Sequence, residues 1–208
     1  MSEAIQTRLS KHKNLWVFIA IWLVTCALYL PAGNAGWVID GVGFLYNLKH
    51  QSFWDFINRT SSEDQSFYQL FTLHYYVFYK LFGMNMWLWS ILYITAHAAG
   101  GMLFFRFSNR LLADSGIKRN ILIPVCAAIL FSISPHISEI IACRAYFHYL
   151  LAFIFMMLIL IEVQGYQHDQ KNKHVAAALA YYILAAFTLE IFYLIPFLVI
   201  TIGIYYRY

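Results

Sequence analysis

The feature that most constrains this chain is a succession of long apolar runs separated by short polar segments. Of the 208 residues, 62% are hydrophobic and only 12% are charged, about half the charged share of a soluble domain. Too little polar surface remains to cover a water-facing globule, so we expect an integral membrane protein. The apolar runs cover residues 15–30, 86–107, 121–133, 149–163, 175–189 and 191–206.

We predict an all-α fold: one domain, residues 1–208, forming a polytopic transmembrane helix bundle with about six spans. Residues 1–14 are polar and form a cytoplasmic tail in this interpretation. Two interpretations of residues 15–30 stay open, a first span or a signal peptide, and we favour the span because the run is long for a signal peptide. Only Glu190 separates the last two runs, so we expect one of them to be tilted, broken or partly inserted.

Residues 31–85 are predicted to form a long external loop that contains interfacial helices. Apolar side chains recur at helical spacing between residues 41 and 58, which predicts an amphipathic helix in the membrane interface. Residues 67–82 are apolar but rich in Tyr, and they fit either a second interfacial helix or the start of a span.

Three small or polar residues stand out in the run 86–107. We expect His97 to be a packed, hydrogen-bonded core residue, because a lone histidine in a span more often packs in the core than acts as a ligand. Gly100 and Gly101 predict that another helix approaches closely there.

Charge asymmetry predicts the topology. With the N-terminus in the cytoplasm, 10 of the 14 Lys and Arg residues lie inside and 4 outside, in agreement with the positive-inside rule. We therefore expect a multi-pass protein of a bacterial inner membrane or of the endoplasmic reticulum. This topology gathers Asp40, Glu139, Arg144 and Glu190 near the outer face, where one cleft can hold them.

Two classes of partner are not expected. The cations form no basic stripe, which argues against nucleic acid. Cys26, Cys126 and Cys143 form no CxxC pair, and the eight His residues are scattered, so we predict neither a metal site nor a cofactor.

The segment 131–151, FSISPHISEIIACRAYFHYLL, places ionisable residues between two apolar runs. Two interpretations stay open: a functional site, because charge at membrane depth is costly, or an ordinary surface loop with solvated charges. In the functional interpretation Arg144 and His136 lie near the phosphate group of a bound donor substrate, since Arg binds phosphate bidentately. In the other, Glu139 and Arg144 simply pair and join helix ends.

Three further segments stand out: YQLFTLHYYVFYKLFGMNMWLWSILYITAHAAGGMLFF, FSISPHISEIIACRAYFHYLLAFIFMMLILI and AYYILAAFTLEIFYLIPFLVI. They resemble the N-terminal membrane module of the GT-C glycosyltransferases, in the protein O-mannosyltransferase branch that includes the transmembrane-and-TPR proteins. Together they cover most of the chain after the first run.

The resemblance implies a function and roles for several residues. It implies transfer of a sugar from a polyprenyl-phosphate donor to an extracytoplasmic acceptor, with Asp40 as the catalytic base. Glu139 and Glu190 match acidic residues of the family, and with His148 they are expected to support the site. Gly41 stands where the family often has a second acid, and the chain is shorter than such enzymes, so it looks truncated.

A second function stays open from the same residues. A bundle of this kind with one acid can serve as a non-catalytic membrane subunit, a scaffold whose aromatic side chains contact partner subunits within a larger complex. Lipids are expected partners in either case. A transporter or channel is less favoured, because the sequence has no repeat between its halves and no charged ring.

Overall fold

The computed structural model describes residues 13–34, 37, 39–57, 69–116, 120–134, 139–141, 146–188 and 193–205. Every regular element within these residues is helical, which confirms the all-α part of the predicted fold class. Short helical turns also occur at residues 53–57 and 139–141. The named elements are α2 (Lys13–Tyr29), η1 (Leu30–Asn34), α3 (Ile39–His50), α5 (Gln69–Phe82), α6 (Met86–Asp114), α7 (Leu122–Ser132), α9 (Phe147–Asp169), α10 (Asn172–Ala186) and α11 (Ile195–Tyr205).

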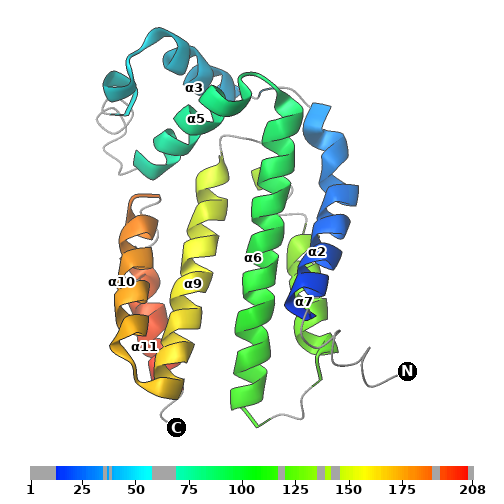
Figure 1. Cartoon of the computed structure of the whole chain (residues 1–208), viewed down its shortest axis with the longest axis vertical. Coiled ribbons are helices and arrows are strands. Elements are labelled where there is room, and N and C mark those ends of the chain that lie inside the picture. Colours follow the sequence, from blue (N-terminus) through cyan, green and yellow to red (C-terminus); the bar gives the residue numbers. More distant parts are fainter. Residues whose placement is uncertain are drawn as a thin grey trace.

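The helices form a bundle with a cap across one end (Figure 1). The six helices α2, α6, α7, α9, α10 and α11 run along the long axis, whereas α3 and α5 lie across the end where α6 and α9 begin. We call α3, the turn 53–57 and α5 the cap layer, and the opposite end, with the α9–α10 turn, the polar end. All six predicted apolar runs thus fold as helices of the bundle.

Helix α6 is central because glycines let its neighbours approach closely. A Cβ atom on Gly101 would lie 2.6 Å from Ser132 Oγ of α7 and 3.2 Å from Ile21 Cγ2 of α2. A Cβ atom on Gly100 would lie 3.3 Å from Phe153 Cδ1 of α9. The close helix approach predicted for this glycine pair is confirmed.

The predicted core role of His97 is also confirmed. Its side chain is fully buried, and its Nε2 lies 3.0 Å from the carbonyl oxygen of Ser132. Because a carbonyl only accepts, Nε2–H is the donor. The Tyr29 hydroxyl donates to the same carbonyl at 3.1 Å, so α2, α6 and the end of α7 share one polar contact in the core.

Helices α6 and α9 also hold each other through two reciprocal contacts near the polar end. Gln164 Nε2 of α9 donates to the Phe107 carbonyl of α6 at 3.3 Å. Arg110 Nη1 of α6 donates to the Ile161 carbonyl of α9 at 3.4 Å. Each side chain satisfies a backbone carbonyl of the other helix, which fixes how far the two helices are shifted along each other.

The cap layer differs from the single amphipathic helix expected at residues 41–58. Helix α3 ends at His50, and a new helical turn begins after Ser52. Ser52 Oγ accepts from the Asp55 backbone N–H at 3.2 Å and donates to Asp55 Oδ2 at 2.6 Å. This reciprocal contact resembles a capping box, which starts a helix.

The last two bundle helices are farther apart in sequence than expected. Helix α10 begins at Asn172 and ends at Ala186, and α11 begins at Ile195. The chain leaves α10 at Phe187 and Thr188, which form a turn before Glu190. Both the start and the end of α10 therefore lie earlier in the sequence than the apolar run 175–189, and Glu190 lies outside the described residues.

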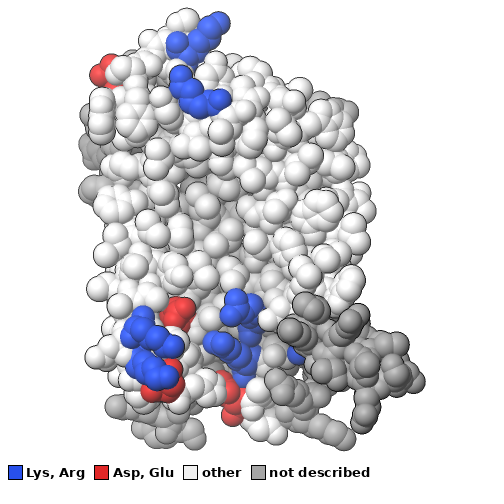
Figure 2. All heavy atoms as spheres, viewed as in Figure 1, with Lys and Arg blue, Asp and Glu red and all other residues white. Residues whose placement is uncertain are grey.

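Charged side chains gather at the two ends of the molecule. Figure 2 shows Lys, Arg, Asp and Glu at both ends of one face and a broad band between them that carries none. Among the described residues, the polar end has five cations and three carboxylates: Lys13, Arg106, Arg110, Lys171 and Lys173, with Asp114, Glu162 and Asp169.

Two of the helices are long and apolar enough to cross a bilayer. They are α6, with 29 residues, and α9, with 23, compared with the about 20 that a span requires. Helices α2, α10, α7 and α11 have 17, 15, 11 and 11 residues. Helix length within the described residues therefore supports two full spans.

Candidate functional site at the cap end

The cap layer meets the bundle through a cluster of aromatic side chains. Phe71 and Tyr75 of α5 pack with Trp89 and Tyr93 of α6 and with Phe147 of α9, and all five are almost completely buried. The rings of Tyr93 and Phe147 stack with their centroids 4.3 Å apart. The Tyr-rich run 67–82, for which two interpretations were open, therefore forms a cap helix packed on the bundle.

Among the described residues, His74 is the one histidine buried at the centre of this cluster. Its Nδ1–H donates to the Phe71 carbonyl, so Nε2 carries no proton in the neutral ring and accepts from the Tyr93 hydroxyl at 3.1 Å. Burial, with a smaller contribution from nearby His148, lowers the pKa of His74 to about 3, against the raising effect of the hydrogen bond to the Phe71 carbonyl. His74 is therefore a neutral connector between α5 and α6.

His148, a predicted supporting residue, lies beside this cluster. It is half-buried at the start of α9, and its ring centroid lies 4.8 Å from that of Phe71 and 4.3 Å from that of Tyr149. The structure thus brings His148 against the cap helix α5.

Asp40, the predicted base, lies in the first turn of α3, and its side chain is outside the described structure. Its neighbour Gly41 is buried within the cap layer. A Cβ atom on Gly41 would lie 3.2 Å from Trp37 Cε3 and 3.7 Å from the Tyr75 hydroxyl oxygen. A second acid at position 41 would crowd the Trp37 ring, which gives a physical reason for the glycine.

The other predicted site residues are placed only in part. Glu139 is exposed and begins the turn 139–141, whose Ile141 packs against Tyr29 and Ile94 at the cap end of the bundle. The Leu70 N–H of α5 donates to the Phe187 carbonyl at 3.1 Å, so the end of α10, shortly before Glu190, lies beside the cap. His136, Arg144 and Glu190 lie outside the described residues.

A cavity of about 300 Å³ opens between α3, α5 and the turn that leads into α6. Its walls include the rings of Trp37, Tyr46 and Tyr79, and Lys49 is its one cation among the described lining residues. Lysine binds phosphate as a point charge, so the cavity suits an anionic ligand with an apolar part. Lys49 was not predicted, although it shares a helix face with Val42, Leu45 and Tyr46.

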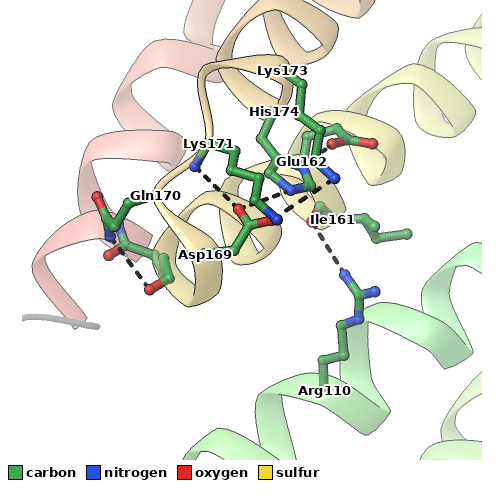
Figure 3. A network of polar contacts seen from close by, with 9 residues as sticks. Arg110, Ile161, Glu162, Asp169, Gln170, Lys171, Lys173 and His174 are labelled. Atoms are coloured by element: carbon green, nitrogen blue, oxygen red, sulfur yellow. Dashed lines mark hydrogen bonds and ion pairs between the residues drawn. The ribbon is translucent and has the colours of Figure 1, made fainter.

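A second polar cluster, at the polar end, was also not predicted (Figure 3). The His174 ring of α10 lies between two carboxylates of α9, with Nδ1 2.5 Å from Glu162 Oε2 and Nε2 3.1 Å from Asp169 Oδ1. The closest signal in the sequence was an acid in an apolar run, Glu162, followed by a histidine across a short turn.

Asp169 anchors the turn between α9 and α10. Partial burial raises the pKa of its carboxyl, but the hydrogen bonds from Lys171 and His174 outweigh that effect and lower the pKa to about 2. Lys171 and Lys173 also form ion pairs with Asp169, at 3.2 and 3.8 Å. One carboxylate therefore faces two ammonium groups and an imidazole ring.

Within the described residues, no group of three or more His, Cys, Asp or Glu side chains is arranged to hold a metal ion. Comparisons with known proteins give no relative: no family model matches the chain, and no curated protein or solved structure matches it. The candidate site is therefore argued from the residues themselves.

Proposed function

We propose that the chain is a multi-pass membrane protein with about six membrane-inserted helices, whose cap end faces away from the cytoplasm. The support is the uncharged band between two charged ends (Figure 2), because lipid chains disfavour charge at that depth. The excess of cations at the polar end supports the orientation. Four bundle helices are shorter than a full span, so they cross a thinned bilayer or end in protein contacts.

Within that membrane protein, the cap end acts as a glycosyltransferase module on a polyprenyl-phosphate sugar. The observation that carries this proposal is the gathering of the predicted segments at one end: the start of α3 with Asp40, the turn with Glu139, and the start of α9 with His148. In the mechanism, Asp40 removes a proton from the acceptor while Arg144 and His136 stabilise the leaving phosphate. Glu139, Glu190 and His148 support these groups.

The test is transfer of a sugar from a polyprenyl-phosphate donor by the full-length protein in vesicles. Asp40→Asn should lower the rate by at least about a hundredfold, since a general base contributes about 10²–10⁴. Asp55→Asn is the matched control, because it removes a negative charge from the same layer at an exposed position. Full transfer by Asp40→Asn, with a folded protein, would remove the proposed base.

A non-catalytic membrane subunit is the second candidate, and one observation favours it. Tyr46, Trp54 and Leu81 of the cap layer are 64%, 68% and 68% exposed, outside the band where lipid would cover them. Exposed apolar surface of this kind often marks a partner site.

Native mass spectrometry of the protein extracted gently from its own membrane separates the two functions. A lone chain or homodimer with a polyprenyl-phosphate mass supports the transferase, and a fixed place in a large complex without that lipid supports the subunit.

A further inference from the structure

A second cavity, of about 370 Å³, lies between α9, α10 and α11, far from the cap cavity. Its walls are almost wholly apolar, and the lining residues Glu162 and His174, which contact each other, lie at the polar end. Along α11 the lining extends from Ile195 to Gly203, about 12 Å at the rise of a helix. The shape is a long apolar channel with one polar end.

The described residues leave the space beside α11 unfilled. A Cβ atom on Gly203 would meet no other atom within 4 Å. Within the described part of α11, only Ile195 is a buried hydrophobic residue, and Val199 packs partly buried against the α9–α10 pair. Empty apolar space forfeits dispersion contacts along its walls, so an apolar occupant would be stabilised there.

Charge at the end of the channel indicates what the occupant carries. Lys171 and Lys173 lie at the α9–α10 turn beside the lining and pair with Asp169, while Glu162 of the lining contacts His174. Arg106 and Arg110 lie at the same end on α6. Among the described residues the polar end therefore has five cations and three carboxylates, an excess that favours an anionic headgroup. Basic pockets between membrane helices on the cytoplasmic side bind such headgroups.

We infer that this channel is a binding site for an anionic phospholipid. One acyl chain lies between α9, α10 and α11, and the lipid phosphate lies against Lys171 and Lys173 at the cytoplasmic surface. This inference rests on the membrane insertion proposed above, but it is independent of sugar transfer and of the cap end.

The experiment reconstitutes the full chain in vesicles of equal parts phosphatidylglycerol and phosphatidylcholine, then measures the retained lipids by native mass spectrometry. The wild-type protein should retain phosphatidylglycerol preferentially. Lys171→Gln and Lys173→Gln should each reduce that preference by about fivefold, the effect of one cation near an anionic lipid. Lys80→Gln removes an exposed cation from the cap layer and should leave the preference unchanged.

A second pair of variants tests the channel itself. Ala178→Phe fills the channel from α10 and should abolish retention, whereas Ala176→Phe places the same ring on an exposed position of the same helix and should not. Equal retention by all variants, or no preference in the wild-type protein, overturns the lipid site. If an alkaline wash releases the chain from the vesicles, the membrane insertion is wrong and the lipid site falls with it. Loss of sugar transfer alone leaves the lipid site standing.

Discussion

At the scale of single residues, the surroundings of each histidine decide its role. His97 and His74 each donate one ring N–H to a backbone carbonyl and lie within helix contacts. His174 instead lies between the carboxylates of Glu162 and Asp169 at the polar end. One residue type thus connects helices in the core twice and lies between two carboxylates once.

Replacing His74 by Leu is expected to make the free energy of unfolding less sensitive to acid. The pKa of His74 is about 3 in the folded protein, below its ordinary value of 6.5. Between these values the unfolded chain binds a proton at His74 and the folded protein does not. The folded state therefore loses stability as pH falls through this window, by about 1 kcal/mol per pH unit.

The measurement is thermal unfolding in detergent, followed by Trp fluorescence at several pH values across that window. His74→Leu should show a smaller loss of stability towards acid than the wild-type protein. His50→Leu changes an exposed histidine of the cap layer and should keep the wild-type slope. Equal slopes for wild type and His74→Leu would contradict the assignment of a buried neutral His74.

Sequence reasoning at this scale succeeded where one residue had one common role. His97 in an apolar run and the pair Gly100–Gly101 were predicted correctly, because a span offers few alternatives to core packing. His74 and Lys49 were not predicted, since their roles depend on α6, α9 and α3 coming together. The proposed roles of Asp40, His136, Arg144 and Glu190 stay predictions.

At the scale of helices, the apolar runs predicted which segments are helical but not all of their ends. The run 175–189 gave a helix that starts and stops three residues earlier, at Asn172 and Ala186. The stretch 41–58 divided at Ser52, where the Ser-x-x-Asp pattern caps a new turn. Helix ends depend on local polar contacts of this kind, which an apolar pattern does not contain.

Gly101→Ala is expected to destabilise the bundle by about 1–3 kcal/mol, the usual cost of overpacking. The new methyl group would lie 2.6 Å from Ser132 Oγ, whose short side chain donates to the Ala128 carbonyl and has little room to move. Gly43→Ala is the control, because its Cβ atom meets nothing within 4 Å on the exposed side of α3. Unfolding in detergent should show a loss for Gly101→Ala and none for Gly43→Ala; equal stabilities would refute the close packing.

At the scale of the whole molecule, a cap layer covers one end of a helix bundle, and charged side chains lie at both ends of the molecule. The uncharged band and the excess of cations at the polar end were expected from the order of apolar runs and loops. The packing of α5 onto α6 and α9 was not expected, because the aromatic cluster brings together residues that are distant in the sequence.

The proposed orientation predicts which surface a membrane-impermeant reagent reaches. In a protein whose three cysteines are replaced by Ala, Lys49→Cys should react with an impermeant maleimide in intact cells. Asn172→Cys, at the start of α10, should react only after the membrane is permeabilised. Labelling of both in intact cells would refute a cap end and a polar end on opposite sides of the membrane.

The reciprocal contacts between α6 and α9 bear on how this molecule can move. A slide of one helix past the other by a turn, about 5.4 Å, would break both the Gln164 contact with Phe107 and the Arg110 contact with Ile161. These two contacts therefore oppose sliding between α6 and α9. A displacement of α6 at the cap end would accordingly move α9 with it and reach the polar end, instead of being absorbed between the two helices.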